Sequence, residues 1–162
     1  MKTLLRESTC RPTKCKELIS GWHDYIGVKY ASGHGVGSFV FGETFPCTPT
    51  IFCMQWPKWV KREIISNSNR MGTLTNSDLE MAGLLLIWLV MEELCNVKSG
   101  DHVAAFSNNQ PTVSWVDLLE SNRSVAAGHL LRALALILRT KGSLPFTPLH
   151  IAGKQNAMTY IP

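Results

Sequence analysis

The segment from Thr75 to Leu94, TNSDLEMAGLLLIWLVMEEL, constrains the fold more than any other part of the chain. Its middle is apolar on every side, and a helix of this kind belongs in a protein core or in a membrane. The unbroken apolar run Leu84–Met91 is far shorter than the roughly 20 residues that a membrane span needs, and Glu92 and Glu93 close it with charge. The pattern therefore predicts a buried helix that packs against apolar surfaces on more than one side, one of them a sheet.

The start of this helix carries two overlapping capping signals. Thr75 with Asp78, and Ser77 with Glu80, both have the spacing of a capping box, so the first turn should form near Asn76. We expect Asp78 to face solvent. Glu80 then lies in the first turn of a buried helix, where a carboxylate is ordinarily a surface group favoured by the helix dipole; a functional site is the alternative.

The bulk composition indicates one globular domain. The chain has 162 residues, 45% of them apolar and 17% charged, which is enough to bury a core. Residues 1–21 are polar and basic and are interpreted as a lead-in segment, with the domain over residues 22–162. The net charge of +4 permits contact with nucleic acid without requiring it.

Cysteine usage and the N-terminus indicate an intracellular protein without a membrane segment. The five cysteines are an odd number without a C-x-x-C pair, which is typical of reduced thiols. Cys10 and Cys15 with His23 do not have the spacing of a zinc site. The first residues, MKTLLREST, lack the apolar stretch of a signal peptide.

The remaining periodicities predict three strands, the central helix and then a mixture of helices and strands. The expected strands are Tyr25–Ala31, Val36–Glu43, Thr50–Gln55, His102–Ser107 and an edge strand within Leu144–Ala152. The other expected helices are Trp56–Ser66, Thr112–Leu119 and Ser124–Lys141. The glycine-rich run SGHGVG is expected to be a hairpin turn and not a phosphate loop, because no helix follows it. This order predicts an α/β fold with a mixed sheet.

Six blocks of the sequence occur in the order of one known family. They are YASGHGVGSFVFGE, the WP within Gln55–Lys58, LTNSDLEMAGLLLIWLVMEEL, FSNNQPTVSWV, LLRALALILR and TPLHIAGKQNAMTYIP. Together they resemble the ribonuclease H-like domain of retroelement reverse transcriptases over nearly the whole chain. The resemblance implies a five-stranded mixed sheet with strand order 3-2-1-4-5, flanked by helices. It also implies cleavage of the RNA strand of an RNA–DNA hybrid, with two Mg²⁺ ions held by four acidic residues.

The chain departs from that family pattern at three of the four acidic positions. Tyr30 stands in place of the aspartate of the first strand, Asn108 in place of that of the fourth strand, and Tyr160 in place of the last one, so that Glu80 alone remains. One carboxylate should not hold two divalent ions, and neutral tyrosines, with a pKa near 10, are poor ligands for Mg²⁺. We therefore expect no metal cofactor.

The resemblance also predicts how these residues are arranged. Tyr30 and Asn108 should be neighbours, with Glu80 facing them, and Tyr30 should fill the former metal space with its hydroxyl near Glu80 or Asn108. A rebuilt metal site from Asp78, Glu80 and Asp101 is disfavoured, because Asp78 is expected to face solvent.

We interpret the chain as a catalytically inactive ribonuclease H-like module retained for nucleic-acid or protein binding. The alternatives are an active metal-dependent RNA–DNA hybrid ribonuclease, and a structural remnant without a function of its own. Lys58, Lys61 and Arg62 could contact phosphates, although a solvated basic face explains them equally well. Any binding to a hybrid or another nucleic acid should be weak and salt-sensitive. The chain lacks a polymerase part, so it should not copy nucleic acid.

Overall fold

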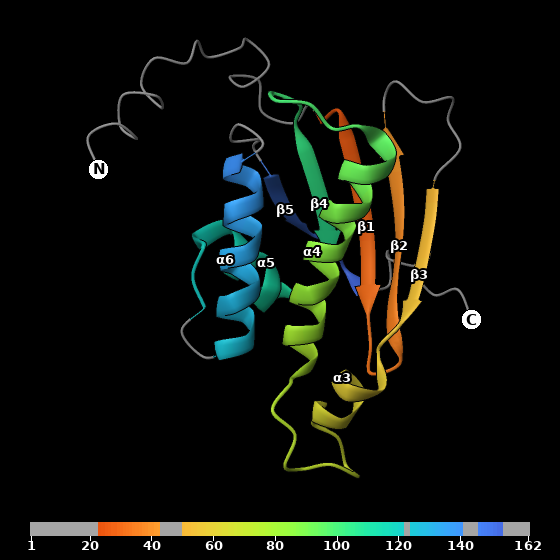
Figure 1. Cartoon of the computed structure of the whole chain (residues 1–162), viewed down its shortest axis with the longest axis vertical. Coiled ribbons are helices and arrows are strands. Elements are labelled where there is room, and N and C mark those ends of the chain that lie inside the picture. Colours follow the sequence, from red (N-terminus) through yellow and green to blue (C-terminus); the bar gives the residue numbers. More distant parts are fainter. Residues whose placement is uncertain (1–22, 43–49, 122–123, 141–145, 154–162) are drawn as a thin grey trace.

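The computed structural model describes residues 23–42, 50–121, 124–140 and 146–153 (Figure 1). Its elements are β1 (Tyr25–Ala31), β2 (Gly35–Gly42), β3 (Thr50–Gln55), α3 (Lys58–Glu63), α4 (Asn76–Cys95), β4 (Val103–Ser107), α5 (Gln110–Leu118), α6 (Val125–Thr140) and β5 (Phe146–His150). Each of them is predicted from the sequence with ends that differ by a few residues. The lead-in segment and Tyr160 lie outside the described residues.

The five strands form one mixed sheet with the order β3-β2-β1-β4-β5, which confirms the predicted order 3-2-1-4-5. β1 pairs with β2, and β2 with β3, in antiparallel fashion, whereas β4 pairs in parallel with both β1 and β5. β5 is an edge strand, as expected from Pro148, because proline cannot donate a hydrogen bond to a second neighbouring strand. The parallel strands β1 and β4 therefore end at the same edge of the sheet, which is where the site residues lie.

Helix α4 packs directly on the middle of the sheet. A Cβ atom at Gly27 of β1 would lie 2.2 Å from Met91 Cε and 2.4 Å from Ile87 Cδ1, so the absence of a side chain at Gly27 allows this close approach. Trp88 is fully buried, as predicted, and its ring meets that of Phe146 edge-on, with 5.6 Å between the ring centroids. The core is therefore built around the helix that the sequence singles out.

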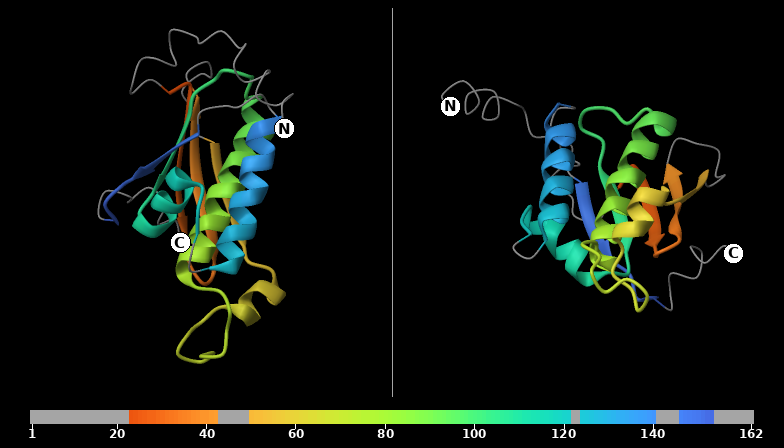
Figure 2. Two further views of the ribbon diagram at one scale, coloured as in Figure 1. Left: turned by 90° about the vertical axis from the view of Figure 1, so that its left-hand side faces the viewer. Right: turned by 60° about the horizontal axis from the view of Figure 1, so that its bottom comes forward.

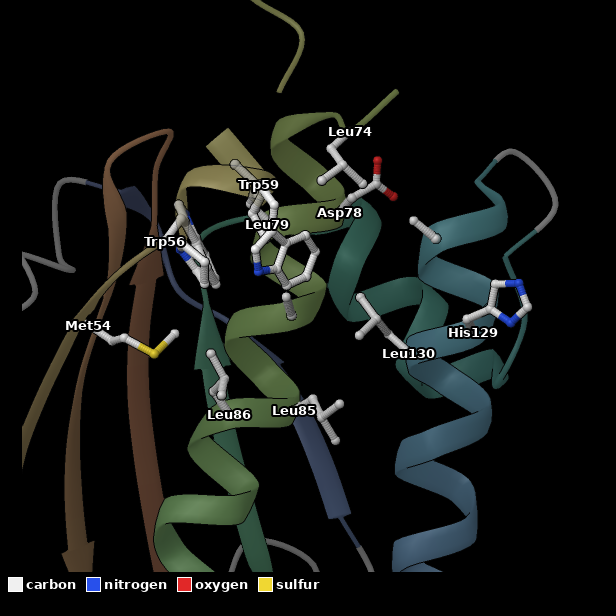
Figure 3. A pocket seen from close by; sticks show the side chains of 14 residues that line it. Met54, Trp56, Trp59, Leu74, Asp78, Leu79, Leu85, Leu86, His129 and Leu130 are labelled. Atoms are coloured by element: carbon white, nitrogen blue, oxygen red, sulfur yellow. The ribbon is translucent and has the colours of Figure 1, made fainter. Parts of the chain in front are cut away.

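The three sides of α4 have different surroundings. One side lies on the sheet, and α6 packs beside it on the same face of the sheet (Figure 2). Its outer side lines an apolar pocket together with β3, α3 and α6 (Figure 3). The prediction of apolar contacts on more than one side is therefore confirmed for the sheet and for α6. No helix within the described ranges is long and apolar enough to cross a membrane.

The start of α4 is fixed by one of the two predicted capping boxes. The Asp78 backbone N–H donates to Thr75 Oγ1 at 3.3 Å, and the Thr75 backbone N–H donates to Asp78 Oδ2 at 2.7 Å. The expectation that Asp78 faces solvent is wrong. Asp78 is buried, because the Ser124 hydroxyl before α6 donates to its second carboxylate oxygen. Asp78 thereby ties α4 to α6.

Candidate functional site

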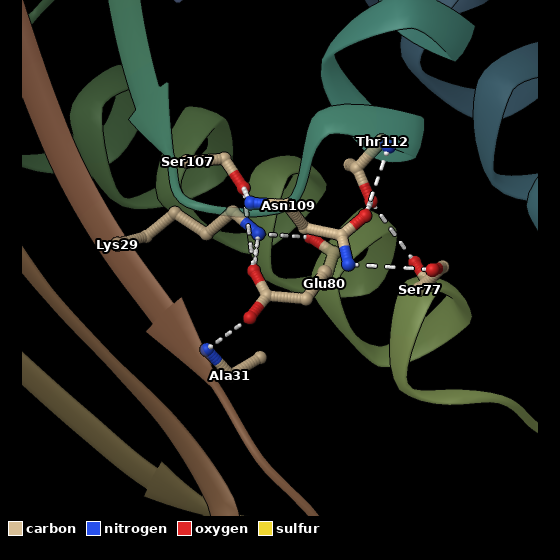
Figure 4. Close-up of polar contacts among 7 residues, drawn as sticks. All are labelled: Lys29, Ala31, Ser77, Glu80, Ser107, Asn109 and Thr112. Carbon is tan, nitrogen blue, oxygen red and sulfur yellow. Dashed lines mark hydrogen bonds and ion pairs between the residues drawn. The ribbon is translucent and has the colours of Figure 1, made fainter. Parts of the chain in front are cut away.

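Glu80 lies just beyond the first turn of α4, not within it as expected, and points toward the sheet at the ends of β1 and β4 (Figure 4). Its side chain is only 1% exposed. A carboxylate in such a place must find a counter-charge or hydrogen-bond donors, because transfer of an isolated charge out of water costs far more than folding can offset. The partners of Glu80 therefore define what this site can do.

The counter-charge is Lys29 of β1, whose side chain is fully buried. Its ammonium forms an ion pair with Glu80 Oε2 and also donates to the Glu80 backbone carbonyl oxygen at 2.5 Å. Two further donors come from the described residues: the Ala31 backbone N–H lies 3.2 Å from Oε1, and the Ser107 hydroxyl lies 3.4 Å from Oε2. The carboxylate is thus held by β1 on one side and by the end of β4 on the other.

Burial changes the protonation equilibrium of Lys29. Loss of hydration lowers the pKa of Lys29 from 10.5 to about 8, while the charge of Glu80 and its hydrogen bond act in the opposite direction. At neutral pH the ammonium form predominates, so the site holds one positive and one negative charge.

This pKa shift makes stability depend on pH above neutrality. Between about pH 8 and pH 10.5 the unfolded chain keeps the proton on Lys29 that the folded chain has released, so this residue makes the free energy of unfolding rise with pH. The slope should be at most about 1.4 kcal/mol per pH unit. Urea denaturation at a series of pH values, compared between the natural chain and Lys29→Met, measures it. A difference between the two proteins that stays constant over this range would contradict the assignment.

A second group of polar contacts fixes the end of β4 against the start of α4. Asn109 caps α5, since its Oδ1 accepts from the Thr112 backbone N–H at 3.0 Å and from the Thr112 hydroxyl at 2.7 Å. Its Nδ2 donates to Ser77 Oγ at 3.3 Å, and the Thr112 hydroxyl donates to the Ser77 carbonyl oxygen at 3.2 Å. Ser77 therefore bonds to the β4–α5 junction and does not cap α4 with Glu80.

The structure changes the predicted arrangement around Glu80. We expected Tyr30 to fill the space beside Glu80, but Lys29 occupies that space. Neighbouring residues of a strand point to opposite faces, so Tyr30 is directed away from the face on which α4 packs. Asn108 follows Ser107 at the end of β4 and is partly exposed. Tyr160, the third substituted position, cannot be compared because it lies outside the described residues.

Lys29 is the candidate site residue that the sequence-based prediction missed. It is the one charged residue in the predicted strand Tyr25–Ala31. The alternation of that strand places Ile26, Val28 and Tyr30 on one face and leaves Lys29 on the other, so it does not indicate that Lys29 is buried. The available signal was the carboxylate of Glu80, because a buried carboxylate needs a cation as its partner.

The donor set around Glu80 does not fit a pair of Mg²⁺ ions. Lys29 places a positive charge against the carboxylate, and three protein donors use most of its lone pairs. The disfavoured metal set is not assembled either: Asp78 bonds to Thr75 and Ser124, and Asp101 accepts from the Lys98 backbone N–H in the loop before β4. Across the described ranges, no three His, Cys, Asp or Glu side chains are grouped as metal ligands would be.

The basic residues proposed to contact phosphates lie on a different element from Glu80. Lys58, Lys61 and Arg62 are all exposed on the short helix α3, after the end of β3. Trp59 stands among them with 70% of its surface exposed. This short helix therefore offers three cations and an aromatic side chain to solvent.

Comparison with solved structures identifies the fold. LC11-RNase H1, obtained from compost by a metagenomic approach and solved in complex with an RNA/DNA hybrid, superimposes with a TM-score of 0.58 at 14% identity, over 83% of this chain and 90% of that one. The N-terminal RNase H domain of a Mycobacterium tuberculosis protein gives a TM-score of 0.52 at 12% identity, over 83% of this chain and 92% of that one. RNase H1 of Halobacterium salinarum gives a TM-score of 0.51 at 11% identity, over 83% of this chain and 89% of that one. No family model and no curated protein sequence matches the chain. The fold is therefore ribonuclease H-like.

Proposed function

We propose that this chain is a ribonuclease H-like module that binds nucleic acid without cleaving it, and that it derives from a retroelement reverse transcriptase. The observation that carries this proposal is the buried ion pair between Lys29 and Glu80. In the resembled family the equivalent glutamate holds Mg²⁺, whereas here an ammonium group of the same chain neutralises it.

Electrostatics explains why this pair opposes metal catalysis. A divalent ion at Glu80 would sit against a buried ammonium, in surroundings where water screens the repulsion poorly. Two-metal hydrolysis needs several carboxylates to hold ions a few Å apart, and the substitutions Tyr30, Asn108 and Tyr160 remove the others that the resemblance implies. Lys29 takes the place that a metal ion would have as the partner of Glu80, so the buried carboxylate is neutralised without metal.

Binding to nucleic acid is supported by two observations. LC11-RNase H1 carries an RNA/DNA hybrid in its structure, and we propose a hybrid as the ligand of this chain as well. Lys58, Lys61 and Arg62 supply exposed positive charge on α3. Such contacts with phosphates position a duplex without reading its sequence.

We expect no cleavage of a labelled RNA–DNA hybrid by the purified chain in Mg²⁺ or Mn²⁺, together with weak binding that salt abolishes. Three cations release at most about three counterions, so log K against log salt should have a slope no steeper than about −3. Gel electrophoresis measures cleavage, and fluorescence anisotropy at several salt concentrations measures binding.

Two variants make this experiment decisive. The double substitution Lys61→Glu and Arg62→Glu should flatten the salt slope by about 2, since each phosphate contact contributes about 1. Lys98→Glu, in the loop before β4, is the matched control and should leave the slope unchanged. Metal-dependent cleavage that Glu80→Gln abolishes in a folded protein would overturn the proposal and establish the active ribonuclease instead.

A further inference from the structure

The outer side of α4 is apolar, and the described elements cover it only in part. Ala82, Leu86 and Leu89 lie on the side of the helix opposite Glu80, as the helical repeat requires. Leu89 is 41% exposed, and Leu85 and Leu86 are partly exposed. A soluble helix ordinarily places polar residues on such a side, so this apolar surface needs an explanation.

The surface is hollowed into a groove with a volume of about 410 Å³, within the range of ligand pockets, about 300–1,000 Å³. Its lining comes from β3, α3, α4 and α6 (Figure 3) and includes Trp56, Trp59, Leu85, Leu86, His129 and Leu130. Trp56 is anchored, because its ring N–H donates to the Ser32 carbonyl oxygen at 2.6 Å. The groove therefore has a fixed aromatic wall.

The chemistry of the lining selects the occupant. Twelve of the fourteen lining residues are apolar. The carboxylate of Asp78 is already bonded to Thr75 and Ser124, which leaves His129 as the polar side chain at the rim. The polar edges of a nucleobase would lose their hydrogen bonds to water against this apolar lining. Leucine or phenylalanine side chains need no hydrogen-bond partner when they are buried there.

The charges around the groove favour a bound molecule that carries acidic residues beside its apolar side chains. Lys58, Lys61 and Arg62 lie on the same short helix as the lining residue Trp59, and only Glu63 opposes them there. On the other rim, Arg132 is exposed and lies three residues beyond His129 on α6. Positive charge therefore stands on both sides of an apolar groove.

We propose that this groove docks a segment of a partner protein that inserts large apolar side chains and carries Asp or Glu beside them. Buried apolar anchors supply most of the affinity of such interfaces, while complementary charges on the rim orient the segment. The groove is on the side of α4 away from Glu80, so this inference does not depend on whether the chain cleaves nucleic acid.

The test is selection from a random-peptide display library on the immobilised full chain, followed by affinity measurement with synthetic peptides. We expect the enriched peptides to share apolar anchors flanked by Asp or Glu. Ala82→Phe, which fills the groove from α4, should weaken their binding at least about tenfold. Leu118→Phe is the matched control, since Leu118 is 70% exposed on α5 and does not line the groove, and it should change nothing.

The contradicting outcomes are specific. A library that yields no binder, binders that Ala82→Phe leaves unchanged, or an enriched set with Lys and Arg flanks would each overturn the proposal. Isotope-labelled methyl groups of Leu85, Leu86 and Leu130 provide a second readout. They should shift on addition of an acidic-flanked peptide, and a larger shift with a single-stranded oligonucleotide would assign the groove to nucleic acid instead.

Discussion

Replacing Lys29 with methionine should lower the free energy of unfolding by about 3–5 kcal/mol, the cost of leaving one member of a buried ion pair without its partner. Glu80 would keep its donors from Ala31 and Ser107 but would lose the counter-charge that Lys29 supplies. A small domain is stable by about 5–15 kcal/mol, so the loss is a large share of the total. Urea denaturation of the variant and of the natural chain measures the difference.

The double variant Lys29→Met with Glu80→Gln separates this effect from a simple loss of packing. It removes both charges, while the glutamine oxygen still accepts from the Ala31 backbone N–H, so it should recover most of the lost stability. The exposed Lys61→Met is the matched control and should stay within about 0.5 kcal/mol of the natural chain. If the double variant were as unstable as the sum of its two single changes, the two residues would not be coupled and the assignment of the pair would be wrong.

The fold is largely predictable from this sequence because its signals are local. The apolar centre of α4, the alternation in β1 and Pro148 in β5 each indicate a local element, and the order of elements limits the sheet. The ends of α3 were predicted less accurately, because the apolar and basic residues after Pro57 are compatible with a longer helix than the one that forms. α3 ends at Glu63, whose carbonyl oxygen accepts hydrogen bonds from the Thr73 and Leu74 backbone N–H groups of the following loop.

The site was less predictable because its contacts join residues far apart in the chain. The family pattern directed attention to Tyr30, whereas the residue that reaches Glu80 is its neighbour Lys29, 51 residues from Glu80 in sequence. The burial of Asp78 likewise depends on Ser124, 46 residues away. The groove depends on where α6 packs, which the apolar pattern of α4 alone does not specify. Spacing within one element predicts none of these contacts.

We expect the natural chain to bind no Mn²⁺ at Glu80, and we expect a variant with a rebuilt acidic site to bind it. The variant combines Lys29→Asp with Asn108→Asp and Tyr160→Asp, because Lys29 is the β1 residue whose side chain reaches Glu80. Among the described residues, these changes remove one positive charge and add two negative ones, so the formal charge of Glu80 with positions 29 and 108 falls from zero to −3. Tyr160→Asp adds the last carboxylate of the resembled pattern. Without metal the variant should be less stable than the natural chain, because its carboxylates repel one another, and Mn²⁺ should restore about 2.7 kcal/mol at 100 times its Kd.

The same set of changes with Lys29 retained shows whether the ammonium group is what excludes the ion. Calorimetric titration should give a saturable Mn²⁺ site in the variant with Lys29→Asp, a weaker one when Lys29 remains, and none in the natural chain, because a buried ammonium opposes any cation placed beside Glu80. Equal affinity with and without Lys29 would mean that the lost carboxylates alone explain the loss of metal. No binding by either variant would mean that these positions do not form the site, and that the ribonuclease H-like fold carries its acidic residues elsewhere in this chain.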